Sequence, residues 1–218
     1  MAINKKQSSM WVKAVLIFVA LAFVVSLTPG LFMGRNSAAQ DTGATETGAT
    51  LERIANEHLA AVTSNTAVLE SDPENYGALV TLGNTYFDWA FQIRNQVGPT
   101  SGHDLPIWNA AVSAYERALA VQPGDPNVEV DLAIALFYSG QADRAIELVE
   151  QVMETSPEFA PAYFNAGIFY RAFGRTDDAV AALERYLELE PEGSSAASAR
   201  DMLAQMAAAP SGEATTTP

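Results

Sequence analysis

Side chains able to carry out chemistry are few in this chain and follow no catalytic pattern. It has two histidines, His58 and His103, and no cysteine. The histidines lack a metal-ligand spacing such as His-x-x-x-His, and without thiols there is no disulfide, thiolate zinc site or cysteine-linked haem. The sequence also lacks a glycine-rich phosphate loop and a Gly-x-Ser-x-Gly turn. We therefore predict no catalytic, metal-binding or cofactor-binding residue, and a surface or packing role for each histidine.

Two pairs of neighbouring residues contain acids that could act as catalytic groups. Asp177 and Asp178 fall where a helix is expected to begin, and carboxylates there complement the helix dipole and the free N–H groups. A hydrolase that uses His103 with Asp104 is the enzyme alternative, and unchanged activity in a His103→Ala protein would eliminate it. The prediction is a protein without enzymatic activity.

The distribution of charge restricts the partners. All 26 acidic residues follow Gln40, and that part of the chain contains eight arginines and no lysine, which leaves a net charge of about −18. Nucleic acid and anionic lipid would be repelled by it. Most of these carboxylates are expected to form a solvated surface.

Helices that could position a binding surface are indicated by an internal repeat. Three prolines close successive segments at intervals of 34 residues, and alanines and larger residues keep the same period: Pro123, Pro157, Pro191; Ala111, Ala145, Ala179; Tyr115, Val149, Leu183. A 34-residue period with small residues at fixed places is typical of helix pairs that stack on one another as a solenoid. The pattern favours holding a partner over chemistry.

Three repeats are predicted, at 76–125, 126–159 and 160–193. The second begins with Asp125-Pro126, which suits a capped first turn. In the first, Tyr86 and Ala111 are 25 positions apart where the others have nine, so sixteen residues are inserted. We assigned this insertion to residues 92–108, with Gly98-Pro99 ending the first helix and Pro106 in the first turn of the next.

The repeats resemble the tetratricopeptide family through Leu82-Gly83-Asn84-Thr85-Tyr86, Ala111 to Leu119, and Tyr163, Ala166, Gly167 and Tyr170. The resemblance implies an all-α fold, a right-handed superhelix of helical hairpins with a groove lined by first helices. It also places this chain with bacterial membrane-anchored members, including a cytochrome c biogenesis-like group.

The family's groove positions map onto three residues of each first helix: Val80, Asn84, Phe87, Val130, Ile134, Phe137, Phe164, Ile168 and Arg171. Most are apolar, and packing beneath a neighbouring helix is the alternative role for each. Chaperone-binding relatives hold a carboxylate with a Lys/Asn clamp. Asn84 matches one clamp position, but the domain has no lysine, which favours an apolar or partly basic peptide.

Two further helices are expected to flank the repeats. One runs from about Leu51 to Leu69 and is closed by Pro73; the other, at 195–206, would cap the solenoid. The domain would thus cover 51–206. A flexible linker is expected at 35–50 and a disordered tail at 207–218, because both segments are short of large apolar residues.

The N-terminal residues predict a membrane anchor. Residues 14–34 contain no charge and are long enough to span a bilayer as a helix. Lysines at 5, 6 and 13 precede the segment, so residues 1–13 are placed in the cytoplasm and the repeats on the periplasmic or extracytoplasmic side of a bacterial cytoplasmic membrane. A signal peptide cleaved near Ser37-Ala38-Ala39 is the alternative. Gly30 and Gly34 form a GxxxG spacing, a weak signal of dimerisation.

The function predicted is a membrane-anchored, non-enzymatic scaffold or chaperone-like adaptor that binds a segment of an envelope protein and needs no cofactor. The sequence leaves open whether the protein forms a homo-oligomer. Presentation of an apocytochrome c to its haem-attachment machinery is one alternative, and an accessory subunit of a secretion or foldase complex is another. The insertion, with Trp108, is a second candidate contact site, although a tryptophan there is more typical of a core.

Overall fold

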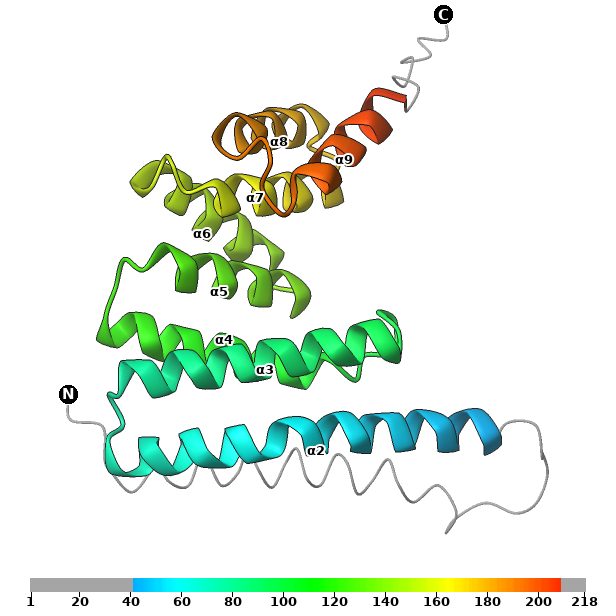
Figure 1. Ribbon diagram of the computed structural model, residues 1–218, viewed down its shortest axis with the longest axis vertical. Helices are drawn as coiled ribbons and strands as arrows, with labels where there is room; N and C mark the ends of the chain where they lie inside the picture. Colours follow the sequence, from blue (N-terminus) through cyan, green and yellow to red (C-terminus); the bar gives the residue numbers. More distant parts are fainter. Residues whose placement is uncertain (1–40, 209–218) are drawn as a thin grey trace, which may run out of the picture. The chain divides into compact units, whose positions relative to one another are not determined.

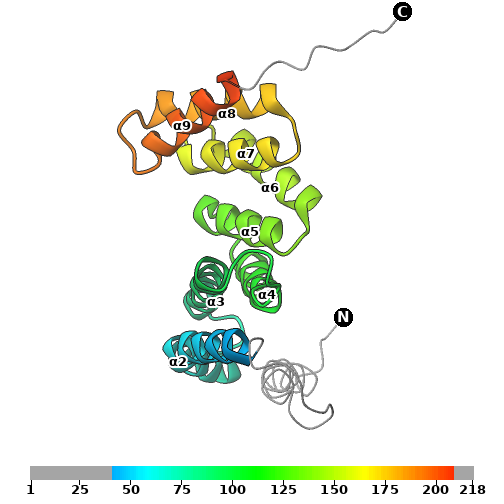
Figure 2. The ribbon, with the colours of Figure 1, turned by 90° about the vertical axis from the view of Figure 1, so that its right-hand side faces the viewer.

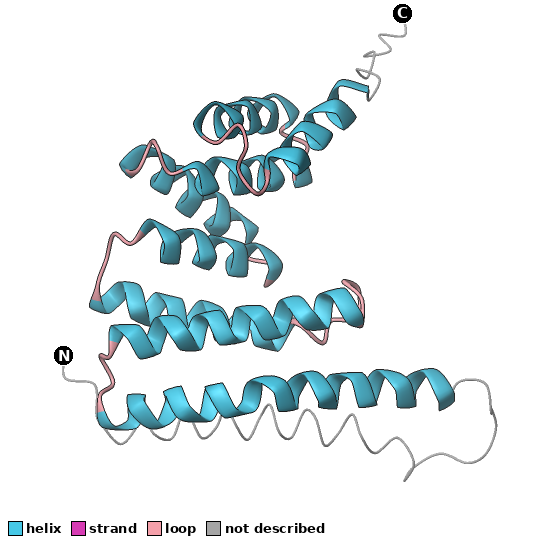
Figure 3. Cartoon of the chain, viewed as in Figure 1, coloured by secondary structure: helices cyan, strands magenta, loops and turns pink. Residues whose placement is uncertain are grey.

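The computed structural model describes residues 41–208, where all regular structure is helical (Figure 3). The chain divides after Val121 into two compact units. In the described part, unit 1 holds the first three helices and unit 2 the remaining five (Figure 1). Their bounds are α2 (Asp41–Ser71), α3 (Tyr76–Gln96), α4 (Leu105–Val121), α5 (Pro126–Tyr138), α6 (Ala142–Thr155), α7 (Ala160–Ala172), α8 (Thr176–Leu189) and α9 (Ala196–Ala208).

Helix α2 begins earlier than the sequence indicated. Residues 41–50, expected in the flexible linker, are helical instead. From Leu51 onward, α2 buries Ile54, Val62 and Leu69. Once those side chains fix the helix against α3, each added turn costs little, because propagation is much more favourable than nucleation. The apolar pattern begins only at Leu51, so it could not indicate the preceding turns.

In unit 1, α3 contacts both α2 and α4 (Figure 2). The insertion lengthens its helices: α3 has 21 residues and α4 has 17, whereas α5 and α6 have 13 and 14. The inserted segment 92–108 is therefore a turn with helical ends, since Gln92 lies in α3 and Trp108 in α4. Gly98, at φ 112°, follows the end of α3, and Pro106 lies in the first turn of α4, as predicted.

The turn between α3 and α4 is held by a buried carboxylate. Asp104 is 1% exposed and accepts hydrogen bonds from Trp108 Nε1 at 3.1 Å and Arg94 Nη1 at 3.3 Å. Its backbone carbonyl accepts from the amides of Ile107 and Trp108. A buried charge is tolerated when paired and hydrogen-bonded. Asp104 thus joins the end of α3 to the start of α4.

Glycine allows the two helices of a repeat to approach closely. A Cβ at Gly83 would lie 2.5 Å from Tyr115 Cε1, and one at Gly167 would lie 2.6 Å from Leu183 Cγ. Tyr115 and Leu183 are both buried. The small and large residues of the repeat pattern therefore occupy one contact, with the glycine of the first helix receiving the ring or branched side chain of the second.

Unit 2 stacks its five helices in chain order, and α5 also contacts α7. Asp125 caps α5 by accepting from the Asn127 amide at 3.0 Å, with Pro126 in the first turn, as predicted. Positive-φ glycines, Gly140 and Gly174, lie in the turns that precede α6 and α8. The predicted helix at 195–206 is found as α9, which packs on Leu183 and Tyr186 of α8.

The predicted membrane anchor, residues 14–34, lies outside the described residues, as do residues 1–13, residues 35–40 and most of the predicted tail. Within residues 41–208, no helix combines the length and apolarity that crossing a bilayer requires.

Candidate functional site

Equivalent positions of α5, α7 and α9 form a shared surface in unit 2. Phe137 of α5 stacks on Phe169 of α7 with ring centroids 4.6 Å apart. Arg171 Nη2 of α7 donates to Gln205 Oε1 of α9 at 3.0 Å, across a separation of 34 residues. We name this surface the first-helix face and define it by two rows of residues. The members of each row are 34 residues apart in the sequence: Ile134, Ile168 and Met202 in one row, and Phe137, Arg171 and Gln205 in the other.

Exposure differs along the first-helix face. Ile134, Ile168 and Met202 are half-buried, so each keeps apolar surface in contact with solvent. Arg171 and Gln205 are exposed. Rows separated by three residues lie on the same side of an α-helix, so the apolar row and the polar pair are neighbours.

Two of the predicted groove residues in unit 2 are used for packing. Val130 is 3% exposed and cannot line a surface in this conformation. Phe164 is half-buried and tilted against the Tyr186 ring, with centroids 5.2 Å apart. These two residues serve helix packing, the alternative role considered for every groove position.

In unit 1 the predicted groove residues lie along α3. Val80 and Phe87 are half-buried and Asn84 is exposed. Asn84 Oδ1 accepts from the Tyr115 hydroxyl at 2.8 Å, and Phe87 meets the edge of Trp108 at 5.1 Å between centroids. Asn84 therefore stabilises the contact between α3 and α4, and its side-chain oxygen is already used in that hydrogen bond.

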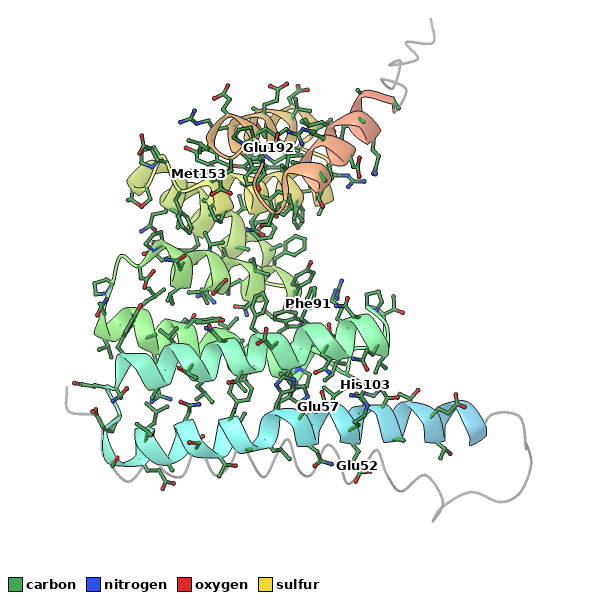
Figure 4. All side chains as sticks on the ribbon, in the orientation of Figure 1. Glu52, Glu57, Phe91, His103, Met153 and Glu192 are labelled. Carbon is green, nitrogen blue, oxygen red and sulfur yellow. The ribbon has the colours of Figure 1, made fainter. Side chains whose placement is uncertain are left out.

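Sequence reasoning missed Phe91, which continues this line one turn beyond Phe87. It is 47% exposed and projects from α3 on the side away from α2 (Figure 4). The i, i+4 spacing from Phe87 was readable, but only the three groove positions that the family resemblance implies were taken from this helix. The groove positions of α3 are thus followed by an exposed aromatic residue.

Met202 and Gln205 of α9 were also missed. The 34-residue spacing from Ile168 and Arg171 was visible in the sequence, but α9 was interpreted only as a cap. The positions of α9 that correspond to Leu82 and Gly83 of α3 hold Arg200 and Asp201, both exposed. Helix α9 is therefore a first helix in register whose other side is polar.

The carboxylates of unit 2 gather on its second helices. Exposed acids include Asp143, Glu147 and Glu154 on α6 and Asp177, Asp178 and Glu184 on α8, whereas α7 contains none. Tyr170 donates to Glu150 at 2.8 Å, and burial together with this bond raises the pKa of the phenol. These acids form the solvated surface that the composition indicated.

The titratable groups in the described part form no catalytic arrangement. The His58 ring stacks on the ring of buried Trp89, with centroids 5.9 Å apart, and His58 Nε2 lies 2.8 Å from Gln92 Oε1. His103 lies in the exposed loop, while Asp104 is engaged by Trp108 and Arg94 rather than presented to solvent. No group of three or more His, Cys, Asp or Glu in residues 41–208 is placed to hold a metal ion.

Comparison with known proteins agrees with the repeat register. A family model described as tetratricopeptide repeat matches residues 108–152 and 136–206. Residues 108–206 therefore contain tetratricopeptide repeats, and the described part of the chain, residues 41–208, folds as an all-helical solenoid of this type. The second match of the family model, residues 136–206, includes Met202 and Gln205 of α9, which agrees with placing these residues in the repeat register.

Similarity to individual proteins is partial. The chain is 32% identical over 84 residues to the small glutamine-rich tetratricopeptide repeat-containing protein 2 of Mycosarcoma maydis, covering 38% of this chain and 24% of that protein. It is 28% identical over 98 residues to anaphase-promoting complex subunit 3 of Dictyostelium discoideum, covering 45% and 10%. The chain thus spans a quarter or less of the length of these relatives.

Two solved structures of similar fold have low identity. A structure of MamA AMB-1 is 18% identical with a TM-score of 0.49, covering 77% of this chain and 81% of that one. The first repeat domain of Spaghetti (RPAP3), bound to the HSP90 peptide SRMEEVD, is 19% identical with a TM-score of 0.45, covering 59% and 94%.

Proposed function

We propose that this protein is a non-enzymatic scaffold that binds a segment of a partner protein on the first-helix face. Tetratricopeptide domains are protein-interaction modules, and this class supports the proposal. The observation that carries it is the row of Ile134, Ile168 and Met202, half-buried at equivalent places of three successive first helices, with Met202 also packed on the core of α8 and α9. A continuous apolar row with a polar edge is typical of a surface that accepts an extended or helical peptide.

The packing of unit 2 selects the position for a crosslinking test. Phe137 stacks on Phe169, so replacing it would disturb α5 and α7 together. Ile168 lies in the middle of the apolar row and is half-buried. Glu184 is exposed on α8, a second helix, and supplies a matched control position in the same unit.

We expect a photoreactive residue at position 168 to crosslink one dominant partner in cells, identified by mass spectrometry, while position 184 does not. Double replacement Ile134→Ser with Ile168→Ser should weaken recovery of that partner about tenfold or more, because two apolar contacts are lost. Equal crosslinking from both positions, or no crosslink from 168, would count against the proposal.

We further propose that residues 14–34 anchor the scaffold in a bacterial cytoplasmic membrane, with the repeats on the outer side facing an envelope protein. The length and charge flanks of this segment support the proposal. We expect the full chain to stay with membranes after carbonate extraction, and a chain lacking residues 1–40 to be released. Protease added to spheroplasts should digest the repeats. Repeats that resist the protease in intact spheroplasts but not in lysed ones would contradict the outer placement.

A further inference from the structure

We infer that Arg171 and Gln205 form a carboxylate-binding pair, which makes the first-helix face selective for an apolar segment with one acidic side chain. The inference rests on the proposed function and names the chemistry of its partner. It concerns a Glu or Asp inside the bound segment, flanked by aliphatic residues.

The hydrogen-bond partner of Arg171 differs from those of three other arginines in unit 2. Its guanidinium is exposed, and its hydrogen-bond partner among the described residues is the neutral amide of Gln205. Arg175, Arg185 and Arg200, by contrast, each lie within 4.0 Å of a carboxylate. Among residues 41–208, Arg171 is paired with no carboxylate, although the chain after Gln40 carries a net charge of about −18.

The hydrogen bond between Arg171 and Gln205 leaves both side chains with N–H donors that can bind an anion. Gln205 Oε1 accepts from Arg171 Nη2, so the Gln205 Nε2 group keeps its two N–H donors. The guanidinium also keeps further N–H donors in a planar fork. A carboxylate has two oxygens and can accept from the guanidinium and the amide together.

The apolar residues beside Arg171 and Gln205 indicate which side chains should flank the carboxylate in the bound segment. The apolar row lies three positions before the pair on each helix, so aliphatic side chains of the partner would lie beside its carboxylate. The face continues from Arg171 to Phe137 on α5 and to Gln205 on α9, which suits a chain that passes over the site rather than ending there. An acidic tract is disfavoured, because the acids of α6 and α8 would repel it.

Peptide arrays test the inference with the full chain in phosphatidylcholine nanodiscs. Three sets of acetylated, amidated nonapeptides carry a central Glu, Gln or Lys, with flanks drawn from Leu, Ile, Val, Phe, Ala and Ser. A fourth set has central Gln and a free C-terminal carboxylate. The tightest members of each set are then titrated by fluorescence anisotropy.

We expect central-Glu peptides to bind about tenfold more tightly than their Gln counterparts, the effect of a hydrogen bond to a charged group. Arg171→Gln should abolish this difference, and Gln205→Leu should reduce it. Arg185→Gln, which removes an equal charge from α8, should leave it unchanged. Both Arg171 and Gln205 are exposed, so circular dichroism melts should show folded variants.

The inference would be overturned by equal binding of the Glu and Gln sets, by a preference for Lys, or by tightest binding of the free C-terminus. Binding without a Glu preference would leave the proposed function intact, since the face would still accept apolar segments. Absence of binding on all four sets would overturn the inference, and absence of an in-cell crosslink from position 168 would overturn the proposed function separately.

Discussion

Replacement of Trp108 by alanine is expected to lower the free energy of unfolding of unit 1 by about 3–5 kcal/mol, the usual cost of removing a fully buried aromatic side chain. Trp108 has no exposed surface and packs edge-on against Phe87. Its Nε1 also donates to Asp104, so the alanine protein would leave that buried carboxylate with one donor fewer. The measurement is amide hydrogen exchange in α3 and α4.

A second substitution separates the hydrogen bond from the packing. Trp108→Phe keeps an aromatic ring but removes the indole donor, so we expect a loss of about 1–3 kcal/mol. His103→Ala in the adjacent exposed loop should change the free energy of unfolding by about 0.5 kcal/mol or less. Exchange rates in α3 and α4 that are the same in Trp108→Ala as in the unchanged protein would refute the role assigned to Trp108.

The repeat register could be predicted from sequence because each position records one physical contact. Gly83 and Gly167 are small since Tyr115 and Leu183 occupy the space beside them. Asp125 and Pro126 mark a helix start through the hydrogen bond and backbone angle that each supplies. Such local constraints leave a periodic signal in a single sequence.

The helix breaks of the insertion could be predicted, but the contact that organises its turn could not. Gly98 and Pro106 correctly indicated where α3 ends and where α4 begins. The turn is organised by Asp104, whose burial depends on Arg94 and Trp108, ten residues before it and four after it. A contact of this kind has no periodic signature.

The candidate surface was predicted in part. Ile134, Ile168 and Arg171 lie on the first-helix face, but Val130 is buried. Side-chain exposure depends on how far each helix turns toward its neighbours, and the repeat pattern fixes only the contacts within a pair. The contribution of α9 to the first-helix face could be found in the sequence only by applying the 34-residue period once more, from Arg171 to Gln205.

Replacement of Gly83 by alanine is expected to destabilise unit 1 by about 1–3 kcal/mol, although alanine is the better helix former. The new Cβ would lie 2.5 Å from Tyr115 Cε1 and 2.6 Å from Cδ1, and that ring is buried and bonded through its hydroxyl to Asn84. The ring cannot move without breaking this bond or separating α3 from α4. Chemical denaturation followed by circular dichroism measures the change.

Gly77→Ala is the matched control, because it makes the same substitution in the same helix. Its nearest neighbour would be Asn75 Oδ1 at 3.7 Å, an ordinary contact, and the position is exposed. Helix propensity then acts alone, and we expect stability unchanged or raised by up to about 1 kcal/mol. Opposite signs at the two glycines would show that Gly83 is required by the approach of α4 and not by the backbone of α3. Equal effects would show that the close approach to Tyr115 relaxes without cost.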